Sequence, residues 1–244
     1  LTDLSGNGND GTIYGAAWSD DAPSFNEYAG GIYLYDSEPT LSNLLITENS
    51  ATNGGGIYFA SSSPAGLTPT LDNVLISSNT AVSYGGGIAG WAYADFYISN
   101  STIENNSAGS GGGLAALQYF DPYLDNVTIR GNTATSSGGG IFGKSTTTIT
   151  ISNSVISNNT ATDGGGIQAG DSYCILTMDH SLLSGNSATG TGGGIYFWST
   201  GTAYPLSLNN VTITDNLADA GYGSGIYTST AEPDLTVTNS ILWD

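Results

Sequence analysis

The sequence predicts an all-β fold: a right-handed single-stranded parallel β-helix, or solenoid, of about seven to eight coils of ~27 residues. Three observations lead to this prediction. They are a recurring glycine-rich motif, two columns of asparagine and an apolar period of two between these landmarks. Self-similarity at a fixed spacing is the signature of repeat proteins, in which each repeat contacts only its neighbours.

The glycine-rich motif marks one corner of each predicted coil. Gly-Gly-Gly-Ile occurs at residues 54–57, 85–88, 138–141, 164–167 and 192–195, and Gly-Gly-Gly-Leu at 111–114. Glycine adopts positive φ without steric cost and lets neighbouring backbones approach closely. We therefore expect the triplets to stack above one another where the chain turns.

The first asparagine column fixes the register of the repeat. Its members lie 26 to 30 residues apart, each three residues after an aliphatic residue: Asn49, Asn79, Asn106, Asn132, Asn159, Asn186 and Asn216. Stacked side-chain amides can hydrogen-bond from coil to coil, which satisfies polar groups that point inward. We predict that these residues form a structural ladder.

The second column lies three residues before each aliphatic residue. It contains asparagine at every coil except one, where His180 replaces it. Asparagine tolerates the left-handed backbone of a sharp turn. We expect His180 to substitute in this column rather than to act as an acid–base group. The preceding column alternates serine with Asp72, Asp125 and Asp179, which predicts a solvent-facing surface without directly stacked charges.

Between the landmarks, apolar residues alternate with polar ones, and no stretch shows a helical stripe. The dominance of Thr, Val, Ile, Ser, Asn and Gly over Lys, Arg and Glu also disfavours helices. A coil of this length accommodates about three strands of four to six residues and three turns.

The two ends of the chain differ from the repeats. Residues 1–29 do not fit the pattern, and we expect an irregular N-terminal cap or opening segment there, followed by β-helix repeats over residues 30–244. The sequence ends within a predicted coil at Ser240–Asp244. We therefore expect an uncapped C-terminal end that belongs to a longer chain or stacks on another subunit.

Composition restricts the partners. Two basic residues against 21 acidic residues give a formal net charge of −19. We expect no nucleic-acid partner, because no basic patch is available for phosphates. We also expect no membrane insertion, because no apolar run approaches about 20 residues. Acidity and abundant Ser, Thr, Asn and Gly suit an extracellular or cell-surface protein. The single Cys174 is expected to be a buried thiol.

The charged residues do not form a recognisable catalytic set. Asp72, Asp125 and Asp179 fall two coils apart, about 10 Å by strand spacing, without a basic or histidine partner. Arg130 and Lys144, the only basic residues, fall on opposite sides of a glycine corner. We therefore expect no catalytic residues and no enzymatic activity.

The opening segment is a candidate calcium site. Asp3, Asn7, Asn9 and Asp10 offer hard oxygen ligands on a glycine-rich backbone. The alternative is that turn chemistry alone accounts for this Asx/Gly cluster. No other cofactor is expected.

Aromatic residues give the strongest functional signal. Many follow the glycine corner or lie in the variable loop after it, where they are candidates for binding a glycan or a partner by stacking. The alternative is that they shield a sheet edge and fill loop corners. The candidates are Tyr58, Phe59, Trp91, Tyr93, Tyr119, Phe120, Tyr173, Trp198 and Tyr204.

The pairing of Ile-x-x-Asn with Gly-Gly-Gly-Ile, as in residues 46–49 with 54–57 and 156–159 with 164–167, resembles a known repeat. The chain is similar to the polymorphic outer-membrane protein repeats. More broadly, it resembles the right-handed β-helix repeat proteins of bacterial surfaces in the pectate-lyase-like superfamily. The resemblance covers about residues 30–244 and implies a surface-exposed adhesive or structural role.

Taken together, the sequence predicts a non-enzymatic extracellular structural or adhesive β-solenoid. It would be a segment of a surface protein or fibre, with copies able to assemble head to tail. The alternative is a carbohydrate-binding or polysaccharide-cleaving β-helix that uses the aromatic loops.

Overall fold

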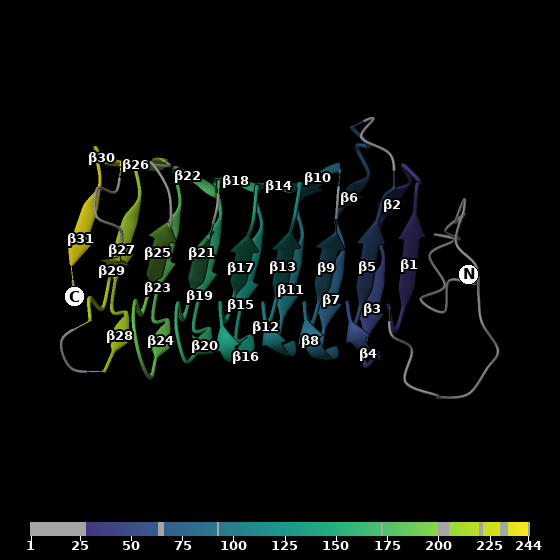
Figure 1. The fold of residues 1–244 in the computed structure, drawn as a ribbon, viewed down its shortest axis with the longest axis horizontal. Coiled ribbons are helices and arrows are strands. Elements are labelled where there is room, and N and C mark those ends of the chain that lie inside the picture. Colours follow the sequence, from purple (N-terminus) through teal and green to yellow (C-terminus); the bar gives the residue numbers. More distant parts are fainter. Residues whose placement is uncertain are drawn as a thin grey trace.

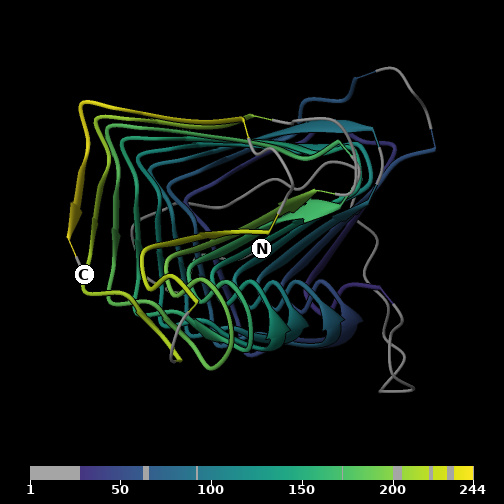
Figure 2. The same ribbon diagram turned by 60° about the vertical axis from the view of Figure 1, so that its left-hand side comes forward.

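The computed structural model describes residues 28–62, 66–91, 93–171, 173–199, 205–219, 222–229 and 234–243. These residues form an all-β solenoid of stacked parallel coils (Figure 1). Viewed closer to the solenoid axis, successive coils follow one another along the same path (Figure 2). The strands form four sheets, which we number I to IV in chain order from the glycine corner; the first seven coils contribute one strand to each sheet, and the last coil contributes to sheets I to III.

Sheet I follows the glycine corner and contains eight strands. They are β1 (Ile32–Tyr35), β5 (Ile57–Ala60), β9 (Ile88–Trp91), β13 (Leu114–Leu117), β17 (Ile141–Lys144), β21 (Ile167–Asp171), β25 (Ile195–Ser199) and β29 (Ile226–Thr228). Their paired residues stay in register from coil to coil, so each sequence column becomes a row across the sheet.

Sheet II follows the variable loop and also contains eight strands. They are β2 (Thr40–Ser42), β6 (Thr70–Asp72), β10 (Ala94–Ser99), β14 (Phe120–Asp125), β18 (Thr148–Ser152), β22 (Ile175–Asp179), β26 (Pro205–Asn209) and β30 (Asp234–Thr238).

Sheets III and IV complete the coil with shorter strands. Sheet III comprises β3 (Leu45–Thr47), β7 (Leu75–Ser77), β11 (Thr102–Glu104), β15 (Thr128–Arg130), β19 (Val155–Ser157), β23 (Leu182–Ser184), β27 (Thr212–Thr214) and β31 (Ile241–Trp243). Sheet IV comprises β4 (Ser50–Asn53), β8 (Thr80–Tyr84), β12 (Ser107–Ser110), β16 (Thr133–Ser137), β20 (Thr160–Ala161), β24 (Ser187–Ala188) and β28 (Leu217–Ala218).

Four strands per coil replace the three expected from the sequence, because positive-φ residues interrupt the chain at three regular positions. In one coil these are Asn73, Ser78 and Gly85, with φ of 53°, 56° and 64°. The second asparagine column supplies the first of these corners, including His180 at φ 45°. The residue before the ladder asparagine supplies the second corner, and the first glycine of each triplet supplies the third.

The second and third glycines of the triplet are required for close approach. A Cβ built on Gly112 would lie 2.5 Å from the carbonyl oxygen of Gly139 and 2.6 Å from that of Thr133. A Cβ on Gly113 would lie 3.1 Å from the side-chain nitrogen of Asn132. The glycine corner therefore packs directly against the next coil and against the asparagine ladder.

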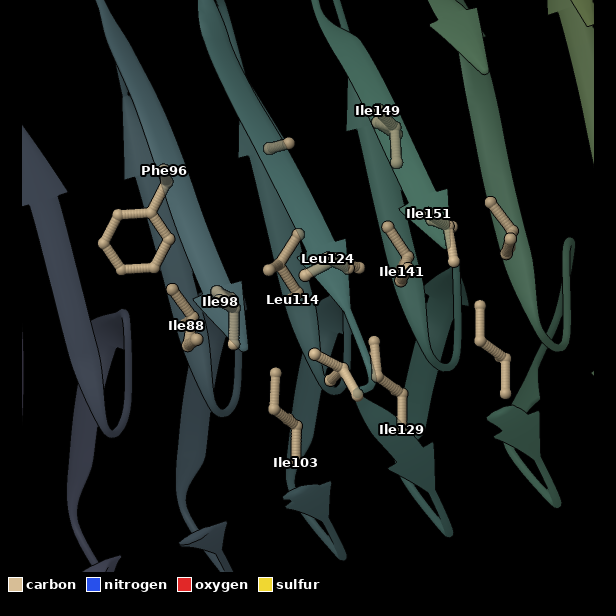
Figure 3. Close-up of a cluster of buried hydrophobic side chains, with 14 of the residues drawn as sticks. Ile88, Phe96, Ile98, Ile103, Leu114, Leu124, Ile129, Ile141, Ile149 and Ile151 are labelled. Atoms are coloured by element: carbon tan, nitrogen blue, oxygen red, sulfur yellow. The ribbon is translucent and has the colours of Figure 1, made fainter. Parts of the chain in front are cut away.

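The interior is a continuous apolar core in which side chains of sheets I, II and III pack together (Figure 3). Within one coil Ile88, Ile98 and Ile103 are at most 1 % exposed, and the same columns are buried in the neighbouring coils. Cys174 belongs to this core, as expected, and burial raises the pKa of its thiol to about 12. The core and the paired strands together fix the outward side of each sheet.

The first asparagine column forms the predicted ladder. Asn132 donates from Nδ2 to Oδ1 of Asn159 at 3.0 Å, and its own Oδ1 accepts the backbone N–H of Asn106 at 3.0 Å. The same two bonds recur between consecutive members from Asn49 to Asn216. Each inward-pointing amide is thereby satisfied by its neighbours, which is the condition for burying it.

Asp72, Asp125 and Asp179 lie on the solvent side of sheet II, where serine or asparagine of the next coil binds them. Asp125 accepts hydrogen bonds from Ser152 Oγ at 2.9 Å and Asn153 Nδ2 at 2.7 Å. These two donors hold the pKa of the Asp125 carboxyl below its ordinary value of 3.8. The alternation of serine with aspartate therefore separates charges and also provides donors to them.

Candidate functional site

The predicted aromatic residues fall into separate groups, and three of them are buried. Phe59 and Phe120 are fully buried, in contact with Phe96 at centroid distances of 6.0 and 5.3 Å. They point into the core because they occupy the inward positions of sheets I and II. The prediction that they bind a glycan or a partner is therefore wrong. Gly90 leaves the space that the Phe120 ring fills.

Tyr58 faces outward from sheet I but is only 5 % exposed, because the rings of Tyr28 and Tyr33 cover it. Burial and the neighbouring tyrosines raise the pKa of its phenol to about 12. Tyr58 therefore contributes to an apolar cluster outside the core and does not offer a free binding surface, contrary to the prediction.

Tyr93, Tyr119 and Tyr173 lie at the corner between sheets I and II, and all three have positive φ. Tyr93 and Tyr119 are 37 % and 41 % exposed and stack at a centroid distance of 5.0 Å with an interplanar angle of 9°. Tyr173 is also exposed. These side chains form a rim along one edge of sheet I.

Trp91 and Trp198 lie on the outer face of sheet I, at the ends of β9 and β25. They bound what we call the sheet I groove. Two adjoining hollows of about 210 and 250 Å³ make up this groove and share Tyr84 and Lys144. Each hollow is smaller than ligand sites in proteins, which are about 300–1,000 Å³, so a ligand of that size has to span both. The described residues that line the groove are Tyr84, Trp91, Ser110, Leu117, Gln118, Ser136, Ser137, Phe142, Gly143, Lys144, Ser145, Gln168, Gly170 and Trp198.

The shape of the groove follows from changes in residue size along two columns. In the first column the fully buried Ala89 and Ala115 separate Tyr58 from Phe142. Tyr84 projects from the glycine corner and stacks on Phe142 at 6.1 Å with an interplanar angle of 9°. In the second column Gly170 pairs with Trp198, and a Cβ there would overlap the indole. Small residues thus form the floor and aromatic rings form the sides.

The two basic residues are in contrasting settings. Arg130 donates from Nη2 to Glu104 Oε2 at 2.6 Å, beside a hollow of about 300 Å³ at the corner between sheets II and III. Its charge is therefore neutralised there. Lys144 is exposed in the sheet I groove, and no ion pair to it occurs within the described ranges. The groove thus contains the one basic side chain that is available to a ligand.

Gln168 lies between Phe142 and Tyr196 on the outer face of sheet I. It is only 7 % exposed, and its Oε1 has no hydrogen-bond partner among the described residues. Buried polar atoms are normally paired, so the unpaired Oε1 is an unused acceptor; it is shielded from solvent here and becomes available to a ligand only when the Gln168 side chain rotates toward the groove. Gln168 and Lys144 therefore offer an acceptor and a cationic donor within one groove.

Carboxylates are not found among the described lining residues of the groove. Asp95 and Asp121 pair across β10 and β14 on sheet II. Burial is the main cause that raises the pKa of Asp121, which accepts the backbone N–H of Thr148 at 2.6 Å, and the charge of Asp95 raises it further. Asp95 and Asp121 resemble an acid–base pair, but they lie on sheet II and not in the sheet I groove.

His180 behaves as a substitute in the second asparagine column. Its Nδ1 lies 2.7 Å from Asp179 Oδ2 and its Nε2 lies 3.3 Å from Asn210 Nδ2. It thus continues the contacts between coils that asparagine makes elsewhere.

Several predicted residues lie outside the described residues: Tyr204, the N-terminal segment up to residue 27, and the candidate calcium ligands Asp3, Asn7, Asn9 and Asp10. Across the part of the chain that the structure describes, no three His, Cys, Asp or Glu side chains gather as a metal site. The same part contains no helix that is long and apolar enough to cross a membrane.

Tyr84, Lys144 and Gln168 were not among the predicted binding residues. A signal for each is present as a break in its column. Tyr84 pairs with Asn53 and Ser110, Lys144 pairs with Leu117 and Gly170, and Gln168 stands between aromatic residues. These breaks indicate a binding site only once the structure shows that the three residues line the same groove on sheet I.

A protein-family description, "right handed beta helix region", matches residues 30–211 of the chain. The match gives the hand of the parallel coils seen here. No curated protein and no solved structure matches the chain.

Proposed function

The chain belongs to the right-handed β-helix family, and from that premise we propose that it is a non-enzymatic extracellular adhesive solenoid that binds carbohydrate in the sheet I groove. The observation that carries this proposal is the combination of an aromatic-lined groove with an unpaired buried amide oxygen at Gln168. The remaining coils serve as the rigid support of that face.

The composition of the groove suits sugar rings. Aromatic faces such as Trp91 and Trp198 present broad apolar surfaces, and polar atoms at a few positions fix orientation. Trp91 is 44 % exposed, whereas Phe142 and Leu117 are nearly buried beneath the groove. The site is therefore mostly preformed, which lowers the entropic cost of binding.

The positions and pKa values of the carboxyl groups favour binding of carbohydrate without cleavage. Glycoside hydrolysis needs two carboxyl groups on either side of one bond, and a carboxylate is absent from the described lining of the groove. Asp72, Asp125 and Asp179 on sheet II have lowered pKa values because asparagine, serine or His180 donates to them, so these three are poor general acids at neutral pH. Head-to-tail assembly of copies stays a prediction.

A glycan-array screen of the chain tests the proposal, with Trp198→Ala as the groove variant and Tyr97→Ala as the matched control. Tyr97 is 41 % exposed on sheet II and packs against Tyr123 at a centroid distance of 5.4 Å, so its removal deletes an exposed aromatic ring from another face. We expect wild type and Tyr97→Ala to bind the same glycans. Loss of one stacking ring should weaken Trp198→Ala at least about tenfold.

Absence of binding by wild type to any glycan would contradict the proposal, as would equal losses in both variants. Release of shorter sugars during the incubation would contradict its non-enzymatic part.

A further inference from the structure

Resting on the proposed function, we propose that the sheet I groove selects a saccharide that carries one carboxylate, with the acid group on Lys144 and a hydroxyl or amide N–H donating to Gln168 once that side chain has rotated toward the groove. The inference adds a ligand class to the groove and names the two side chains that recognise it. It depends on where the few positive charges of the chain lie and on what already occupies them.

The charge distribution makes Lys144 distinctive. The chain has two basic and 21 acidic residues. The guanidinium of Arg130 is bound to Glu104, whereas Lys144 has no ion pair among the described residues. A lysine at this position in so acidic a chain is therefore a specific attractor for one anionic group.

The surroundings of Lys144 leave its ammonium group available. Leu117 and Gly170 are its partners in the neighbouring strands, and neither carries a charge. Asp171 follows Gly170, but its Oδ2 accepts a hydrogen bond from Ser145 Oγ at 2.9 Å. The other described groups around Lys144 in the two hollows are aromatic rings, serines, Gln118 and Gln168. The partly apolar walls strengthen an ion pair with a ligand relative to open water.

Gln168 completes the recognition. It lies in the strand next to that of Lys144, two residues before the position that pairs with Lys144, on the same outward side. Strand geometry separates the two Cα positions by about 8 Å. An acid group on Lys144 therefore places a hydroxyl or acetamido group of the same or the next sugar near Gln168, and rotation of the Gln168 side chain brings its unpaired Oε1 from its buried position to that group.

The net charge of −19 favours one carboxylate over many. A polyuronate places a negative charge on every sugar, but the groove can pair only one of them. The remaining charges would have no cationic partner among the described residues of the groove and would be repelled by the net negative charge of the chain. A mostly neutral glycan with a single uronic or sialic acid gains the ion pair without this repulsion.

The test compares three ligands on the full chain: a neutral oligosaccharide, the same oligosaccharide with one acidic sugar, and the methyl ester of that acidic form. Titration calorimetry gives the Kd of each for wild type, Lys144→Gln, and Arg130→Gln as the matched control. We expect wild type and Arg130→Gln to bind the acid about tenfold more tightly than its ester. Lys144→Gln should bind the acid and the ester equally. Equal Tm values would show that the exposed lysine does not affect folding.

The outcomes separate the inference from the proposed function. Equal binding of acid and ester by wild type would overturn the inference and leave carbohydrate binding intact. A preference for the acid that survives in Lys144→Gln would also overturn it. Failure of all three ligands to bind would overturn both.

Two further ligands test the class directly. Polygalacturonate should bind more weakly than the singly charged glycan, and tighter binding would contradict the single-carboxylate argument. A peptide with a free C-terminal carboxylate should bind no better than its amide. Lys144-dependent preference for the free peptide acid without glycan binding would assign the groove to a protein partner instead.

Discussion

The asparagine ladder and the outer face of sheet I are two parts of the same coils, and they differ in how strictly the sequence repeats. The ladder has the same residue in each of its seven coils, with inter-amide bonds of 2.9 to 3.0 Å. The outer column of sheet I changes from Tyr58 through Ala89 and Ala115 to Phe142 and Gln168. The uniform asparagine column satisfies the hydrogen bonds of buried polar groups, whereas the varied outer column of sheet I forms a groove with different side chains along it.

The comparison predicts that breaking the ladder has the largest effect on stability. Asn132→Ala removes the acceptor of the buried Asn106 N–H and leaves a small cavity. We expect a loss of about 3 kcal/mol or more in the free energy of unfolding. Denaturant titration measures this, with the exposed Thr135→Ala as a control within about 0.5 kcal/mol of wild type. A change as small as that of the control would show that the ladder is dispensable.

A change at the glycine corner should have the next largest effect. A Cβ at Gly112 would overlap the carbonyl oxygens of Gly139 and Thr133, so Gly112→Ala should destabilise the chain by about 2 kcal/mol through forced movement of the backbone. A Cβ added at Gly66 would have no atom within 4 Å, so Gly66→Ala is the matched control. Equal Tm values for the two variants would refute the close-approach argument.

The smallest effect is expected for the aspartates of sheet II, where Asp125→Asn removes a carboxylate that accepts two hydrogen bonds. The pKa of Asp125 is lowered in the folded chain, so its contribution is present above the ordinary value of 3.8 and is lost as the pH falls through the lower, folded value. At pH 7 we expect Tm to differ from wild type by less than about 2 °C. The difference should shrink below pH 3.8, whereas a difference that grows in acid would contradict the direction of the shift.

Periodicity was sufficient to predict the solenoid, its coil length and the ladder, because each of these depends on residues that repeat in every coil. The sequence was less informative about which aromatic side chains point into the core and which point to solvent. Phe59 and Trp91 both lie near the end of a sheet I strand, but Phe59 points into the core and Trp91 points to solvent. Their separation depends on counting from the glycine corner, since adjacent residues of a strand face opposite sides.

The groove could not be predicted from the sequence because its walls come from different sheets. Tyr84 belongs to β8 in sheet IV and meets Phe142 of β17 in sheet I, which lies more than one coil later in the chain. Such a contact depends on how far a ring projects over two small residues, Ala89 and Ala115. The sequence of any one column does not tell how far the Tyr84 ring reaches toward Phe142.

Hydroxyl-radical footprinting of the wild-type chain, with and without a bound glycan from the array, tests the central claim most directly. Tyr84, Trp91 and Trp198 should lose reactivity when the glycan binds, whereas Tyr97 and Tyr123 on sheet II should react as before. Protection of Tyr97 and Tyr123, with the groove residues unchanged, would contradict the assignment of the binding face to sheet I.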